Sequence, residues 1–262
     1  MKIHNRLIIL IICIVSSGCA TTLDYDPAVL RFDTPETTGK FLAGNVSVSS
    51  AVTPNRVLGS INSSIPSDVN PRRYSDSSEE YTQNEFTMGN RLDLGILKDV
   101  DVYYRKLFDT PYIFGSKLQL VGDSQNKKTP GFKVAISAEY GIKTQSHEDG
   151  IPESSTREMY SYDIGVNLGF RLNKHIIVYN NNFYNYHHVQ GTLDRGTPVF
   201  EKKGASKSIG SLFGIRISKA PSGQFVGIEY GFSHIKWPIN DKNKSHEITR
   251  HHSYGATVGY AW

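Results

Sequence analysis

The sequence predicts an all-β protein, an antiparallel up-and-down transmembrane β-barrel of about ten strands, within a range of eight to twelve. Three observations predict this fold: long runs in which apolar and polar residues alternate, a final run that ends on an aromatic residue, and connectors that are alternately short and long. With 38% apolar residues, 21% charged residues and 23 glycines, the 262-residue chain is too polar for a bundle of membrane helices. Aromatic residues at 11% also argue against a disordered chain.

The run from Tyr160 to Leu172 shows the alternation most clearly. Its even positions are apolar, whereas its odd positions are small, polar or charged. Its thirteen residues exceed the five or six of an average soluble strand and suffice for a tilted transmembrane strand, which needs about 9 to 11. Residues 132–142 and 226–232 repeat the pattern. Alternation alone leaves two arrangements open: a soluble β-protein with its apolar face inside, and a membrane barrel with that face toward lipid.

The C-terminal run favours the barrel. Tyr254, Val258, Tyr260 and Trp262 share one face, and the run ends on the aromatic Trp262. This pattern resembles the C-terminal signal of bacterial outer-membrane barrels, which the barrel-insertion machinery reads. The resemblance implies that these four residues form a barrel-assembly signal and that this machinery is a partner.

Strand and connector lengths agree with the same topology. Connectors on one side are mostly short and those on the other side are mostly long, as in barrels with short periplasmic turns and long external loops. An even number of strands puts both ends of the barrel in the periplasm. The ten expected strands cover residues 40–53, 82–97, 100–107, 112–122, 131–145, 157–172, 175–189, 207–218, 224–236 and 247–262. The external connectors are expected at 54–81, 108–111, 146–156, 190–206 and 237–246.

The weakest expected strand is 175–189, because Asn180, Asn181 and Asn182 fall in its middle. In either register at least one amide faces lipid, where an unpaired amide costs several kcal/mol. A β-bulge or an inward kink is therefore expected at this point.

The N-terminus predicts an exported, lipid-modified protein. Lys2 and Arg6 precede nine apolar residues, Leu7 to Val15, a run too short for a bilayer core that needs about 20 residues in a helix. The following Ser16-Ser17-Gly18-Cys19 resembles the lipobox of bacterial lipoprotein precursors, which implies cleavage before Cys19 and a covalent lipid on its thiol. A plain signal peptide with a chance cysteine is the alternative. The chain then divides into a signal peptide at 1–18, a periplasmic tether at 19–39 with at most a short structured plug, and the barrel at 40–262.

Charged residues on the polar strand faces are expected to point into the lumen. Because both signs occur along the strands and a barrel of about ten strands has a narrow interior, the preferred interpretation is a lumen filled by salt-bridged side chains. A narrow pore with a mild anion preference is the alternative. The expected lumen charges are Arg91, Asp93, Lys133, Glu139, Asp163, Arg171, Arg216 and Glu229, with Asp101, Arg105, Lys117 and Lys143 beside them.

The sequence assigns no catalytic residue, metal or cofactor other than the lipid. It contains no HExxH or Cys/His metal spacing, and most histidines are expected in outer loops or at outer strand ends. The strand number resembles that of the omptin surface proteases, but Asp149 and Asp194 lack their paired spacing. His251-His252-Ser253 matches a lipid A deacylase only loosely. A net charge of +4, without a run of five or more basic residues, is too mild to suggest nucleic acid, so no nucleic-acid partner is expected.

The chain as a whole resembles an uncharacterised group of bacterial outer-membrane β-barrel proteins with a lipoprotein-type signal peptide. The resemblance rests on Ser16 to Cys19, on Arg91 to Gly95 and Gly115 to Leu118, and on Tyr260-Ala261-Trp262. It implies a lipid-anchored protein of the bacterial outer membrane with a structural or surface-interaction role, in contact with membrane lipid and an extracellular partner. A narrow passive pore for small polar solutes and a surface enzyme are the alternatives.

Overall fold

The computed structural model describes residues 20–25, 29–63, 74–77, 81–107, 110–148, 154–194, 198–219, 222–236 and 248–262. The predicted signal peptide 1–18 and the predicted lipid-attachment residue Cys19 lie outside the described residues. Within these ranges, no helix has the length and hydropathy of a membrane span.

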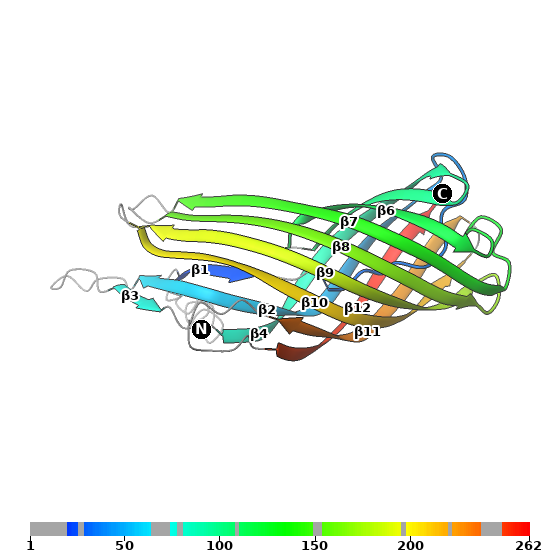
Figure 1. Ribbon diagram of the computed structural model, residues 1–262. Helices are drawn as coiled ribbons and strands as arrows, with labels where there is room; N and C mark the ends of the chain where they lie inside the picture. Colours follow the sequence, from blue (N-terminus) through cyan, green and yellow to red (C-terminus); the bar gives the residue numbers. More distant parts are fainter. Residues whose placement is uncertain are drawn as a thin grey trace, which may run out of the picture.

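Ten strands close into one antiparallel barrel, which confirms the predicted fold class (Figure 1). Strand β2 closes the ring, because it pairs with β4 along one edge and with β12 along the other. All other neighbours in the ring are consecutive barrel strands, so the topology is up-and-down. The barrel strands are β2 (Gly44–Ser63), β4 (Tyr81–Leu97), β5 (Val100–Leu107), β6 (Tyr112–Val121), β7 (Gly131–Glu148), β8 (Ser154–Arg171), β9 (Ile176–Asp194), β10 (Pro198–Ser218), β11 (Gly223–Lys236) and β12 (Ile248–Ala261).

The apolar face of each barrel strand points outward. On β8, Ile164 is 62% exposed, whereas the adjacent Asp163 is 4% exposed. The predicted assembly-signal residues of β12 and Trp262 are likewise on the outer face. A water-soluble protein buries its apolar side chains, so this inverted arrangement selects the barrel whose wall faces lipid.

The two ends of the barrel differ. At the end that we call the turn end, the strands are joined by residues 98–99, 122–130, 172–175 and 219–222, and the C-terminal Trp262 lies there, where its backbone pairs with Gly44. The opposite end, the loop end, carries the other connectors, together with the short strand β3 (Tyr74–Ser77), which pairs with the last residues of β2.

Strands β7 to β10 extend further toward the loop end than the sequence predicts (Figure 1). The expected external connectors 146–156 and 190–206 are mostly strand, and β2 continues to Ser63 within the expected connector 54–81. The physical reason is that beyond the apolar band both faces of a strand contact water. Outward residues such as Glu158 and Lys203 are then polar, so the alternation disappears while the backbone ladder continues.

The asparagine triplet of β9 fits the barrel without the predicted bulge, so that expectation is wrong. The register of β9 with β8 and β10 is continuous through Asn180, Asn181 and Asn182. Asn181 points into the lumen and donates to Glu229 Oε1 at 3.0 Å. On the outer face Asn182 Nδ2 donates to Asn180 Oδ1 at 2.5 Å, and Asn180 Nδ2 donates to Ser211 Oγ at 2.8 Å. Polar neighbours thus satisfy the outward amides, and no backbone distortion is needed.

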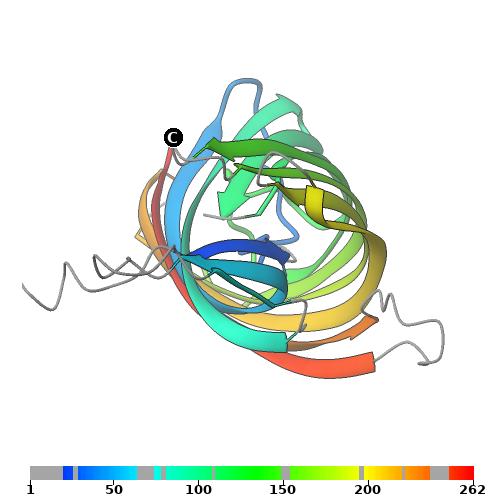
Figure 2. The same ribbon diagram turned by 90° about the vertical axis from the view of Figure 1, so that its left-hand side faces the viewer.

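Residues 20–25 and 29–39, which belong to the expected tether with at most a short structured plug, lie against and inside the barrel. Strand β1 (Ala20–Tyr25) pairs with residues 56–62 of β2 toward the loop end and also contacts β8 and β9. Figure 2 shows β1, in dark blue, lying across the opening of the barrel. Residues 29–39 are then inside the barrel and run toward the turn end, where a turn at 40–43 leads into β2. The reason is electrostatic, because the charged side chains of this stretch find their partners on the inner wall.

We expect Ile164→Arg to destabilise the membrane-inserted barrel by about 2–4 kcal/mol, the cost of an arginine on the lipid face near the bilayer midplane. Urea unfolding in phosphatidylcholine vesicles measures this change. Thr156→Arg is the matched control, because Thr156 is outward on the same strand but near the loop end, and its expected cost is less than about 1 kcal/mol. If Ile164→Arg unfolds like the wild type, the outer face of β8 does not contact lipid.

Candidate functional site

The lumen is filled by residues 29–39, which we call the plug segment. Ten of these eleven residues are buried, and Phe32 is half-buried. Val29 and Leu30 begin the segment and pack against Ala51, Phe183 and Leu212 of the barrel wall. This small apolar cluster marks the level at which the chain enters the wall's polar interior.

Arg31, near the start of the plug segment, contacts four strands, β7, β8, β9 and β11. Its guanidinium forms an ion pair with Asp163, lies 3.4 Å from Glu139 Oε1, and stacks 4.4 Å from the ring centre of Phe183. The Arg31 backbone N–H donates to Glu229 Oε2 at 2.9 Å. Because an unpaired buried charge costs several kcal/mol, these acids fix the position of Arg31.

Asp33 occupies the centre of the lumen. Its Oδ1 atom accepts hydrogen bonds from Arg91 Nη2 at 2.8 Å and from Lys117 Nζ at 3.0 Å. Its Oδ2 atom accepts one from Asn167 Nδ2 at 2.7 Å. One carboxylate therefore ties together β4, β6 and β8 and helps to neutralise Lys117 and Arg91, and Arg91 also pairs with Asp93 at 2.7 Å.

Glu36 repeats this arrangement nearer the turn end. It forms a two-point ion pair with Arg171, with Nε to Oε1 at 2.6 Å, and its Oε1 atom lies 3.9 Å from Lys133 Nζ. Hydrogen bonds to an amide oxygen and to a carboxylate hold the next two residues, Thr37 and Thr38. Thr37 N–H donates to Gln119 Oε1 at 2.8 Å, and Thr38 N–H donates to Asp101 Oδ2 at 2.9 Å.

Two glycines of the wall make room for the plug segment. A Cβ atom at Gly169 would lie 2.7 Å from Pro35 Cγ, and one at Gly95 would lie 2.3 Å from Thr38 Oγ1. Real Cβ contacts are not this short, so any other residue displaces the segment or the wall. The wall is thus shaped for this particular occupant.

Parts of the chain lie across both ends of the lumen. At the turn end the connector 122–130 folds inward, where Gln125 N–H donates to the Thr37 carbonyl at 2.8 Å and Lys128 Nζ donates to Ser218 Oγ at 2.9 Å. Burial, together with the positive charges of Arg171 and Arg216, lowers the pKa of Lys128 to about 8. At the loop end β1 crosses the opening (Figure 2).

The structure places all twelve sequence-predicted lumen charges on the inner face, each at most 9% exposed. Five of them contact the side chains of the plug segment's acids or of Arg31 within 3.4 Å, namely Arg91, Lys117, Glu139, Asp163 and Arg171. Arg216 instead donates to Asn45 Oδ1 at 3.2 Å and stacks over Phe225. The sequence analysis missed Arg31, Asp33 and Glu36 as lumen residues. The signal available was an apolar pair, Val29-Leu30, followed by closely spaced charges of both signs.

The histidines and serines considered for chemistry do not converge. His187 is buried in the lumen and His188 is on the outer face, so the expectation of an outer-rim location is wrong for His187. His252 is exposed on the outside of β12, whereas Ser253 is buried inside, so these two cannot act on one substrate. Within the part of the chain that the structure describes, no group of three or more His, Cys, Asp or Glu residues is arranged to hold a metal ion.

No protein-family model matches the chain, and no curated protein matches it. Among solved structures, it is similar to Ail, the attachment invasion locus protein of Yersinia pestis, at 8% identity and a TM-score of 0.36, over 85% of this chain and 100% of that chain. It is also similar to Neisserial surface protein A, at 11% identity and a TM-score of 0.33, over 84% and 97% of the two chains. These low identities and TM-scores indicate no more than a barrel shape in common. The fold assignment therefore rests on the strand pairing that closes the ring in this chain.

We expect Gly169→Ala to loosen the plug segment, because the added methyl group meets Pro35. Limited trypsin digestion followed by mass spectrometry measures cleavage after Arg31, which is buried in the wild type. Gly165→Ala is the matched control, since its Cβ atom would meet the movable Ser137 hydroxyl and none of its three nearest neighbouring atoms belongs to the plug segment. Faster cleavage in Gly169→Ala alone is the expected result. Equal protection in both variants contradicts a plug seated against Gly169.

Proposed function

We propose that the protein is an outer-membrane β-barrel that conducts no solutes and acts at the cell surface as a structural or interaction protein. The observation that carries the proposal is the plug segment, which lies inside the barrel and whose three charged side chains all have partners on the wall. A passive pore needs a continuous water path along its axis. The plug segment and the connector 122–130 occupy that path.

The outer surface supports the membrane location. Exposed Val, Ile, Leu and Phe side chains cover the middle of the wall, and tyrosines such as Tyr140, Tyr162, Tyr230 and Tyr254 lie on the same face. An apolar band with aromatic residues near its borders is what a bilayer requires of a barrel. The short connectors at the turn end correspond to the periplasmic side, and the loop end then faces the outside of the cell.

We assign the surface role to the part of the wall that extends beyond the apolar band toward the loop end. Near the loop end the outward residues of β7 and β8 change from apolar to polar, as at Thr144, Ser146, Thr156 and Glu158. Paired strands hold their backbones rigidly, so this extension presents side chains in a fixed arrangement to an extracellular partner.

We expect the wild-type protein to be silent in planar-bilayer conductance measurements, once a heat-dependent gel shift has shown a closed barrel. The double variant Asp33→Asn with Glu36→Gln is expected to open discretely. Its Arg91, Lys117 and Arg171 side chains lose carboxylate partners while they stay buried, which makes the seated plug unfavourable.

The matched control is Glu158→Gln with Glu201→Gln, which removes two acidic charges from exposed positions outside the lumen. It is expected to be as silent as the wild type. Discrete openings of the wild-type barrel overturn the closed-lumen proposal and favour the narrow pore. Silence of the lumen double variant shows that the lumen charges do not hold the plug.

Lipid attachment at Cys19 is the second part of the proposal. The sequence Ser16 to Cys19 supports it, and Ala20 lies opposite Asn62 of β2, toward the loop end. We infer that the mature N-terminus is on the external side, not the periplasmic side expected from an even strand count. The acyl chains then belong to the outer leaflet.

An epitope tag inserted after Ala20 is therefore expected to bind antibody on intact cells. A tag inserted in the connector 122–130 is the periplasmic control and is expected to react only in permeabilised cells. If the Ala20 tag also needs permeabilisation, the threading direction is wrong. Loss of the lipid mass in Cys19→Ala tests the attachment itself.

A further inference from the structure

Outward-facing basic residues gather on β10, β11 and β12 near the loop end. The strand registers place Lys207 directly opposite Lys236, and His234 directly opposite Arg250. His252 follows one row below, opposite Phe232. All five basic side chains are exposed on the outer face. We call these five residues the basic patch.

Like charges opposite each other destabilise a sheet unless a counter-charge is present. Of the described acids on β10 to β12, Glu229 is in the lumen and Glu201 lies on β10 six residues nearer the loop end than Lys207. Arg250 stacks 5.0 Å from the ring centre of Phe232, which leaves its guanidinium edge available for an anion. The patch therefore suits an anionic ligand that approaches from the outside of the wall.

The depth of the basic patch identifies the surroundings of that ligand. From Tyr260 to Arg250, β12 advances ten residues, about 34 Å along the strand and, at a tilt of about 40°, about 26 Å along the barrel axis. The apolar band of an outer-membrane barrel is about 25 Å tall. Tyr260 is an exposed aromatic residue at the turn end, as aromatic residues at the inner border of such a band are. With Tyr260 at that inner border, Arg250 and His234 lie at the outer border of the hydrocarbon, where lipid headgroups begin.

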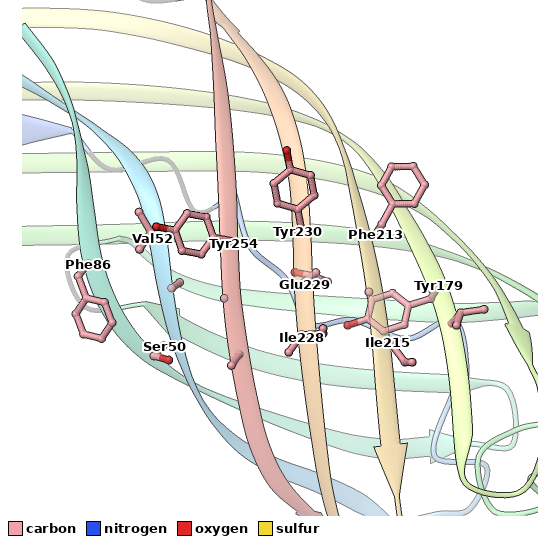
Figure 3. A pocket seen from close by; sticks show the side chains of 15 residues that line it. Ser50, Val52, Phe86, Tyr179, Phe213, Ile215, Ile228, Glu229, Tyr230 and Tyr254 are labelled. Carbon is pink, nitrogen blue, oxygen red and sulfur yellow. The ribbon is translucent and has the colours of Figure 1, made fainter.

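An apolar groove continues from the basic patch toward the turn end. It has a volume of about 680 Å³, with the small residues Ser50 and Ala256 in its floor. Figure 3 shows Phe86, Tyr254, Tyr230 and Phe213 around it. These four aromatic residues are more than 50% exposed, and they come from β4, β12, β11 and β10. This surface is basic toward the loop end and apolar toward the turn end, so it matches an amphipathic molecule.

We propose that the outer face of β10 to β12 binds a phosphate-bearing lipid of the outer leaflet, with the phosphate on Lys207, Lys236 and Arg250 and an acyl chain in the groove of Figure 3. Lysine and arginine are the usual partners of phosphate in proteins. Tyr230 lies between the groove and the basic patch, and its hydroxyl oxygen is 2.9 Å from His252 Nδ1, a contact that holds both side chains in place. The proposal rests on the outer-membrane location proposed above.

Native mass spectrometry of the detergent-solubilised full chain with diphosphorylated lipid A as the probe tests this proposal. The triple variant Lys207→Gln, Lys236→Gln, Arg250→Gln is expected to bind with a Kd at least about tenfold weaker than the wild type. The control triple variant Lys98→Gln, Lys174→Gln, Lys219→Gln removes as many charges from exposed turn-end positions and is expected to bind like the wild type. Ala256→Phe, which fills the groove, is expected to weaken binding of the same lipid.

Each sample is first checked for the heat-dependent gel shift in vesicles, so a failure to insert counts against the outer-membrane location and not against the lipid site. For inserted barrels, equal affinities of the two triple variants overturn the proposal. So does wild-type binding that is as strong for dephosphorylated lipid A as for the diphosphorylated form. Equal binding of the deacylated, phosphorylated sugar also overturns it, because the surface then recognises a soluble anion and not a lipid.

Discussion

The interior of this barrel depends on the mutual neutralisation of the plug segment and the wall. Seven basic and five acidic residues line the wall among the twelve charges named from the sequence, and the plug segment brings two carboxylates and one guanidinium to them. In a lumen with little water, each charge left unpaired costs several kcal/mol. With residues 29–39 in place, several of the wall charges have partners of opposite sign, and the closed lumen that we propose follows from these pairs.

The same charges also explain the topology of the N-terminus. Asp33 and Glu36 can meet Arg91, Lys117 and Arg171 together only if the chain runs from the loop end to the turn end inside the ring. This direction brings residue 40 to the start of β2 with a short turn and leaves β1 at the opposite opening. The outer face of the wall is not part of this network. Its apolar band faces lipid, and the basic patch is the site that we propose for a lipid phosphate.

Strands that cross the apolar band were predictable from the sequence. Residues 100–107 and 131–145 carry the period-two signal along their length, and the structure forms strands there at Val100–Leu107 and Gly131–Glu148. The lumen charges followed from the same alternation, because register fixes which face a side chain occupies. Beyond the band the signal stops, since water contacts both faces, and β9 and β10 were predicted too short for that reason.

The plug segment was not predictable in this way. A single extended chain that is surrounded by wall on every side has no apolar and polar face, so residues 29–39 show no period. Their partners are separated from them by as many as 198 positions, as for Arg31 and Glu229, and only the closed ring brings these together. The asparagine triplet illustrates the same limit, because the mutual hydrogen bond of Asn180 and Asn182 replaces the predicted bulge.

A disulfide between the plug segment and the wall tests the central claim most directly. A Cβ atom at Gly169 would lie 2.7 Å from Pro35 Cγ, and Pro35→Cys removes that ring atom. Cysteines at both positions therefore avoid the clash of Gly169→Ala, and their Cβ atoms come near the separation that a disulfide requires, about 3.5–4.5 Å. In membranes that contain the variant Pro35→Cys with Gly169→Cys, mass spectrometry of the digested protein is expected to find the linked peptide. A correctly inserted, heat-shifting barrel in which these cysteines stay unlinked under oxidising conditions contradicts the account.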